Sequence, residues 1–196
     1  MVLERDFYLL PAQAVARGLL GKKLIRQINN QTICGYILET EAYDGERDKA
    51  CHARNGKTER NKVMYGPGGY AYIYFTYGMH WMLNCVAGES GYPAAVLIRS
   101  IKPVMGLDYI RERRHPIPQE HWTNGPAKLT KALDITGELN GVDLCSKSGG
   151  LFIEEGVTIT DGQVHTTARI GIQYAPEPWK SKKWRFVTEI MNGVEG

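Results

Sequence analysis

The chain has 196 residues, a length that suits one domain able to bury its own core without a disulfide or a metal. Apolar residues make up 43% and charged residues 23%, close to the globular average, which excludes a chain that is disordered throughout. The formal charge of +3 permits a nucleic-acid partner without requiring one. No apolar run reaches the roughly 18 residues of a membrane span, so we expect no membrane partner.

The N-terminus carries Glu4, Arg5 and Asp6 where a signal peptide has its basic and then apolar regions, so we expect a cytoplasmic protein. The four cysteines are far apart and form no C-x-x-C pair, which predicts reduced thiols. The five histidines show no H-x-x-x-H spacing. We therefore expect no dedicated zinc site.

The first half of the chain predicts one helix followed by strands. A short helix is expected between Pro11 and Gly21, and two strands at 23–28 and 32–41 flank an Asn-Asn turn. Residues 44–56 form a polar loop with one helical turn near its middle. The run Gly-Pro-Gly-Gly that follows, at 66–69, breaks any regular element.

A hairpin is expected next, because Tyr70, Tyr72 and Tyr74 alternate on one strand face, Gly78 permits a turn, and 81–87 returns. Later elements are expected as a strand at 94–101, helices at 106–114 and 126–133, and strands at 152–160, 169–172 and 186–188. No linker divides the chain, so we predict a single domain at 1–196 with a flexible tail at 189–196. The fold class is mixed α/β (α+β): a mainly antiparallel sheet with helices packed on it.

Three polar or aromatic positions are candidates for function. Glu39 and Glu41 point to the same side at a strand end, where a carboxylate is well placed to act as a general base. Tyr77 stands at the expected hairpin turn, where a core aromatic has nothing to pack against. Asn84 interrupts an apolar strand and needs a hydrogen-bond partner, in the protein or on a ligand. Each also has a purely structural interpretation: the glutamates as a solvated strand end, the tyrosine as part of a sheet face, and the asparagine as an amide bonded within the protein.

Charge is unevenly distributed along the chain. Residues 39–48 hold five acids and one base, and residues 169–185 hold five bases and one acid. Such runs are most often solvated faces. The alternative interpretation is a carboxylate cluster that does chemistry and a basic surface that binds an anion.

Six short strings fall in an order typical of one family: ETEAY at 39–43, RN at 60–61, YFTYGM at 74–79, Asn84, GPAKL at 125–129 and ARIG at 168–171. From about residue 6 to residue 188, the chain resembles the mammalian-type alkyladenine (3-methyladenine) DNA glycosylases, which also occur in bacteria. The resemblance implies a single compact mixed α/β domain, with a curved antiparallel sheet and a protruding hairpin that inserts into DNA.

The resemblance also implies an activity. Family members flip an alkylated or deaminated purine, of the 3-methyladenine, 7-methylguanine, hypoxanthine and ethenoadenine class, out of double-stranded DNA. They hydrolyse its N-glycosidic bond with an activated water and leave an abasic site. The expectation is a monomer without metal or organic cofactor and without lyase activity, because the family match assigns no amine nucleophile.

By motif match, Glu41 resembles the general base, while Arg99 and the backbone carbonyl of Ile170 resemble the groups that hold the water. Tyr77 resembles the wedge that fills the vacated stack. Asn84 resembles the amide that obstructs the amino group of guanine. The expected base pocket consists of Tyr43, Ala50, His52, Tyr74 and Asn84. The expected contacts to the DNA backbone are Met79, His80, Lys128, Lys180, Lys182, Lys183 and Arg185.

Two other function classes remain open from the residues. A nucleic-acid-binding module without catalysis would keep the tyrosines and the basic segment but has no need of Glu41 with Arg99. A hydrolase of free nucleosides leaves Tyr77 and the basic cluster at 180–185 without a function. Both are less consistent with the residues than the DNA glycosylase.

Overall fold

The structure, a computed structural model, describes residues 1–190. The α-helices of this part are α1 (Arg5–Tyr8), α2 (Ala12–Gly18), α3 (Leu107–Arg114) and α4 (Pro126–Ala132). The strands are β1 (Lys23–Ile28), β2 (Gln31–Asp44), β3 (Ala71–Thr76), β4 (His80–Ala87), β5 (Ala94–Met105), β6 (Leu151–Glu154), β7 (His165–Thr167) and β8 (Arg185–Val187). The 3-10 helices are η1 (His52–Asn55), η2 (Lys62–Tyr65), η3 (Gln119–His121), η4 (Gly137–Leu139), η5 (Lys147–Gly149) and η6 (Asp161–Gln163).

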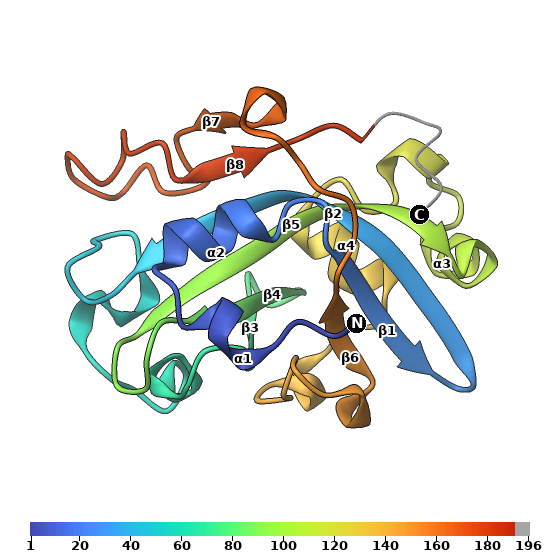
Figure 1. Cartoon of the computed structure of the whole chain (residues 1–196), viewed down its shortest axis with the longest axis horizontal. Coiled ribbons are helices and arrows are strands. Elements are labelled where there is room, and N and C mark those ends of the chain that lie inside the picture. The colour runs from blue at the N-terminus through green and yellow to red at the C-terminus, as the bar shows by residue number, and fades with distance from the viewer. Residues whose placement is uncertain (191–196) are drawn as a thin grey trace.

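The strands form one antiparallel sheet in the order β3-β4-β5-β2-β1-β6, and β7 and β8 pair beside it. The long strand β2 organises this sheet. It pairs with β5 along 34–44, with β1 along 31–36 and with β8 along 39–41. Figure 1 shows the β7–β8 ribbon lying alongside the long β2–β5 pair. The predicted α+β class with a mainly antiparallel sheet is confirmed.

Helix α2 covers the part of β2 that leads to the candidate carboxylates. Its residues Ala12, Val15 and Ala16 are buried in the main core. The hydroxyl of Thr40 donates to the carbonyl of Ala16 at 2.7 Å, so a buried polar side chain of β2 is satisfied by the helix backbone. This contact fixes β2 directly beside Glu39 and Glu41.

The predicted hairpin is present as β3 and β4. Tyr77 and Gly78 have φ values of 52° and 67°, and the N–H of Met79 donates to the carbonyl of Thr76 at 3.2 Å. A tight turn with two left-handed residues matches the twist of the flanking strands, and glycine at its second position avoids part of the strain. The tip is solvent-exposed, with Tyr77 at 81%.

Several predicted strands differ from the structure. The strand expected at 152–160 ends at Glu154, because the N–H of Glu155 bonds to Met1 and that of Val157 to Gly21, outside the ladder. The strand expected at 169–172 does not form. Its backbone bends at Gly171, where φ is 79°, and the N–H of residue 170 bonds to a side chain. The sequence does not predict strand β7, and the last strand lies one residue earlier than expected.

The single-domain assignment is compatible with this sheet. Of the flexible tail predicted at 189–196, residues 191–196 lie outside the described residues. The four cysteines are free thiols, as the sequence predicts. No helix within residues 1–190 is long and apolar enough to cross a membrane.

Candidate active site

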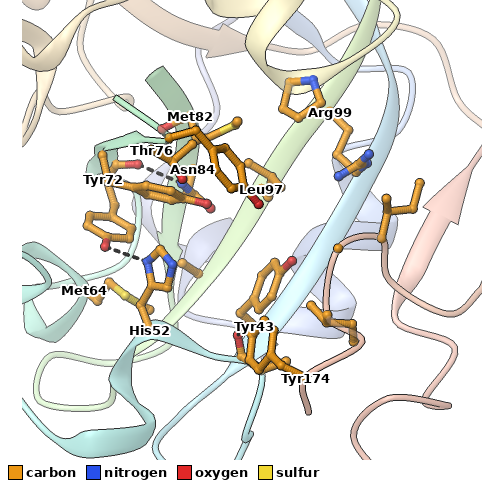
Figure 2. Close-up of a pocket in the computed structure, with 18 residues that line it drawn as sticks. Tyr43, His52, Met64, Tyr72, Thr76, Met82, Asn84, Leu97, Arg99 and Tyr174 are labelled. Atoms are coloured by element: carbon orange, nitrogen blue, oxygen red, sulfur yellow. Dashed lines mark hydrogen bonds between the residues drawn. The ribbon is translucent and has the colours of Figure 1, made fainter. Parts of the chain in front are cut away.

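A cavity of about 210 Å³ lies where the β3–β4 hairpin, β5, the loop after β2 and the segment 170–174 meet (Figure 2). Pockets for drug-sized ligands measure about 300–1,000 Å³, so this cavity fits a ligand smaller than a typical drug. Its aromatic walls are Tyr43, His52, Tyr72, Tyr74 and Tyr174. Flat rings on several sides suit a flat, aromatic occupant.

Two aromatic contacts fix the wall formed by the hairpin and η1. The His52 and Tyr74 rings are 4.4 Å apart at 70°, and the hydroxyl of Tyr72 lies 3.0 Å from His52 Nδ1. Burial, with the nearby positive charges of Arg60 and Arg54, lowers the pKa of His52 to about 4. The imidazole is therefore neutral near pH 7 and adds no positive charge to the cavity.

Asn84 enters the cavity from β4, opposite Leu97 in the register of β5. Its Nδ2 donates to the carbonyl of Tyr72 at 3.0 Å, and only 3% of the residue is exposed. The polar residue in the apolar strand thus finds its partner in the hairpin backbone. This hydrogen bond fixes the orientation of an amide that faces the cavity wall (Figure 2).

Glu41 is fully buried directly behind the cavity, and three donors converge on its carboxylate. The N–H of Ile170 donates to Oε1 at 2.7 Å, the Tyr43 hydroxyl donates to Oε2 at 2.9 Å, and Arg99 Nη1 lies 3.3 Å from Oε2. Burial raises the pKa of Glu41, while Arg99, the Ile170 N–H and Tyr43 lower it. Burial is the largest effect, so the carboxylate is a stronger base than an exposed one.

Glu39 holds Arg99 from the other side. Arg99 Nε donates to Glu39 Oε1 at 2.5 Å, and Arg185 Nε donates to the same oxygen at 2.6 Å. Arg99 therefore bridges two carboxylates of β2, and its exposed side-chain fraction is only 11%. Because the Arg99 guanidinium is paired with both carboxylates, its orientation at the edge of the cavity is fixed.

A family model described as "Methylpurine-DNA glycosylase (MPG)" matches residues 6–191. The chain belongs to the methylpurine-DNA glycosylase family. Family membership gives it a DNA glycosylase function, and DNA glycosylases hydrolyse N-glycosyl bonds in base excision repair.

Similar proteins in other organisms agree with this assignment. A protein of Methanocella arvoryzae named "Putative 3-methyladenine DNA glycosylase" is 47% identical over 94% of this chain and 91% of its own length. Proteins of the same name from Carboxydothermus hydrogenoformans and Borrelia garinii are 47% and 44% identical. These matches cover 88% and 94% of this chain, and 89% and 94% of those proteins.

Within this DNA glycosylase, the structure brings most of the expected site residues together. The expected pocket residues all line the cavity: Tyr43, Ala50, His52, Tyr74 and Asn84. Arg99, Ile170 and the exposed Tyr77 line it as well. Glu41 does not, because its carboxylate is covered by its three donors. The structure shows the Ile170 N–H on this carboxylate, whereas the family resemblance implies a role for the carbonyl of that residue.

The expected contacts to the DNA backbone lie in four places: the hairpin tip, α4, the segment before β8, and β8 itself. Met79 and His80 are exposed at the hairpin tip, and Lys128 is exposed and donates to Asn124. Lys180, near Glu177, and Lys183 belong to the segment before β8. Lys182 lies 3.9 Å and 4.2 Å from the ring centroids of Trp179 and Trp184, and Arg185 is paired with Glu39. The DNA contacts of all seven residues stay predictions.

Several residues of the cavity are not among the sequence candidates. Tyr72 shares a strand face with Tyr74, so the same alternation could have identified it. Met64, Leu97 and Tyr174 carry no signal of this kind, because they are brought to the cavity by distant segments.

Proposed function

We propose that this chain is a monofunctional DNA glycosylase that acts as a monomer on double-stranded DNA. It flips alkylated or deaminated purines out of the duplex, hydrolyses the N-glycosidic bond and leaves an abasic site. The observation that carries this proposal is the buried carboxylate of Glu41, held by Arg99 and the Ile170 N–H directly behind an aromatic cavity.

The cavity explains a preference for damaged purines. Bases alkylated at N3 or N7 carry positive charge, and aromatic faces attract a cation by about 0.5–2 kcal/mol each. Tyr43, His52 and Tyr74 supply such faces, and the lowered pKa of His52 keeps its ring neutral. A cationic base is therefore attracted by the rings and is not repelled by an imidazolium.

The carboxylate explains the hydrolysis. Cleavage of the glycosidic bond builds positive charge on the sugar, as in other glycoside hydrolyses. Water adds to the anomeric carbon, its proton passes to Glu41, and the base leaves with the electron pair of the broken bond. We propose that this water binds between Glu41, Arg99 and the Ile170 carbonyl. To do so, it replaces one of the three protein donors that bond to the Glu41 carboxylate in the structure.

The residues around the cavity favour water as the nucleophile. A lyase needs an amine that attacks the sugar and forms a Schiff base. No lysine lines the cavity within residues 1–190. The proposed product is therefore an intact strand with an abasic site.

The hairpin favours DNA over a free nucleoside as substrate. Extruding a base from a duplex costs a few kcal/mol, which a side chain that fills the gap partly offsets. Tyr77 is exposed at the hairpin tip and also borders the cavity. A nucleosidase has no need of such a residue.

The proposal is tested with duplex oligonucleotides that each carry one lesion of the proposed class. We expect release of the damaged base, and strand breakage only after alkali. Matched duplexes with undamaged adenine or guanine, and free nucleosides, serve as controls. Strand breakage before alkali would contradict the monofunctional mechanism. Hydrolysis of free nucleosides at the same rate would contradict the DNA-specific function.

A further inference from the structure

A buried ion pair joins the two oppositely charged runs of the sequence close to the candidate active site. Arg169 Nη1 and Nη2 donate to the two carboxylate oxygens of Asp48 at 2.5 Å and 2.9 Å. Both side chains have an exposed fraction of 0%. Neither Asp48 nor Arg169 is among the described residues that line the cavity or donate to Glu41. The mechanism proposed above therefore gives this pair no role.

Asp48 organises the loop that forms one side of the cavity. Besides Arg169, its carboxylate accepts the N–H of Asp44 at 3.2 Å and that of Ala50 at 3.0 Å. Its own carbonyl accepts the N–H of Cys51 at 2.9 Å. Ala50 lines the cavity, and Cys51 is the N-cap of η1, the 3-10 helix that begins with His52. The position of this wall therefore depends on Asp48.

Arg169 fixes the segment on the opposite side. Nη1 also donates to the carbonyl of Ala42 at 2.8 Å, and Nη2 to that of Trp179 at 3.3 Å. The guanidinium carbon lies 4.7 Å from the ring centroid of Tyr43 and 5.0 Å from that of Trp184. Because an ion pair, hydrogen bonds to two carbonyls and two aromatic rings hold this guanidinium, the backbone at residue 169 has little freedom.

The next residue in the chain makes the contact that matters for the carboxylate. The N–H of Ile170 donates to Glu41 Oε1 at 2.7 Å, although Ile170 is itself 50% exposed and Gly171 follows at a φ of 79°. An exposed side chain before a glycine does not hold its own backbone in place. Buried side chains hold this backbone on both sides, Arg169 directly before Ile170 and Ile172 after Gly171, and Arg169 is the adjacent one.

We propose that Asp48 and Arg169 form a positioning pair that holds the Ile170 N–H on the Glu41 carboxylate and the pocket loop against the same site. This inference rests on the proposed function, in which Glu41 is the base. The pair acts through Ile170 and through Ala50, and it touches neither the water nor the base. The charged and titratable groups around Glu41 are Glu39 and Tyr43 on its own strand, and Tyr74, Arg99 and Arg185 on other strands.

Loss of this pair has a consequence that loss of an ordinary stabilising ion pair does not have. A backbone N–H that bonds to a carboxylate favours its charged form and lowers its pKa. Release of the Ile170 N–H therefore raises the pKa of Glu41, while Arg99 and Tyr43 stay in place and still lower it. The acid side of the excision rate profile moves to higher pH, by about one pH unit when this one N–H bond is absent.

The test uses two variants of the full chain. Asp48→Asn keeps the shape of the side chain, and the double variant Asp48→Asn with Arg169→Gln leaves no unpaired buried charge. The control is Arg5→Gln with Asp143→Asn, an ion pair at 2.7 Å that also joins distant segments but does not line the cavity. Single-turnover excision of one lesion duplex is measured as a function of pH, and the Glu41 carboxylate is titrated by carbon NMR.

We expect the acid midpoint and the Glu41 titration to rise by about one pH unit in the Asp48 and Arg169 variants and to stay unchanged in the control. A rate that falls equally at every pH, with an unchanged titration of Glu41, would overturn the proposal. So would failure of both variants to fold, since the pair would then support the whole sheet. The NMR titration needs no activity, so it decides the inference even if Glu41→Gln excises normally and the proposed function fails.

Discussion

Replacing Tyr77 with alanine separates a DNA wedge from a residue that only supports the fold. Tyr77 is 81% exposed at the tip of the β3–β4 turn. Alanine keeps the left-handed backbone, where φ is 52°, so the strain of the turn is the same in both proteins. Because little buried apolar surface is removed, we expect the free energy of unfolding to change by no more than about 0.5 kcal/mol.

The effect on DNA is expected to be larger than the effect on folding. Stacking of a base on an aromatic side chain is worth about 1–3 kcal/mol by alanine substitution. At about 1.4 kcal/mol per tenfold, this gives a loss of roughly 5- to 150-fold in the excision rate from duplex DNA. A lesion in a single strand has little stacking to overcome, so its excision should fall much less.

Two assays on one preparation test this prediction. Single-turnover assays give the excision rates from duplex and from single-stranded DNA, and thermal unfolding gives the stability. Tyr92→Ala is the matched control, because Tyr92 is a half-exposed tyrosine in a loop at the opposite end of β4. Equal losses on both substrates would refute the wedge and assign Tyr77 to direct contact with the flipped base. A large loss of stability would refute the reasoning from exposure.

The carboxylate, the basic segment and the half-buried His52 each give a further prediction. Glu41→Gln should lower the excision rate by about 10²–10⁴-fold and leave lesion-DNA binding nearly unchanged; near-normal single-turnover excision would reject Glu41 as the base. Changing Lys182 and Lys183 to alanine should flatten the log–log dependence of DNA affinity on salt by about 0.9 for each phosphate that is no longer neutralised, and an unchanged slope would assign both lysines to the solvated face. The pKa of His52 lies at about 4, below its ordinary value near 6.5, because burial disfavours its charged form. The folded protein should therefore lose up to about 3 kcal/mol of stability as the pH falls from 6.5 to 4, and His52→Phe should remove this loss in pH-dependent denaturant unfolding.

Local patterns in the sequence predict the elements whose residues interact with near neighbours. The strand alternation at Tyr70, Tyr72 and Tyr74 with Gly78 predicts the hairpin, and Pro126 predicts the start of α4. Both depend on backbone preferences that act over a few residues. The same local logic is wrong at 169–172, where it predicts a strand.

The surroundings of Arg169 show why. The basic run around it is typical of a solvated face, but this arginine is buried against an aspartate 121 residues earlier in the chain. Pairing over that distance leaves no local pattern, since neither residue has a distinctive neighbour. The surroundings of Glu41 likewise could not be predicted from local sequence patterns. The sequence places Glu41 at a strand end, whereas β2 continues to Asp44 and stays paired with β5, and only the structure shows that three donors cover the carboxylate.

The hydrogen bond between Ile170 and Glu41 joins residues 129 positions apart, and β8 pairs with β2 from still farther along the chain. Long-range pairings of this kind slow folding, because a large loop must close before they form. During synthesis, the carboxylate strand leaves the ribosome long before the segment that covers it. A nascent chain that ends before residue 170 has the aromatic hairpin, Tyr43 and Arg99, but lacks the N–H that donates to Glu41 Oε1. If Glu41 is the base, as proposed, the complete set of donors around it forms late, when nearly the whole described chain has been made.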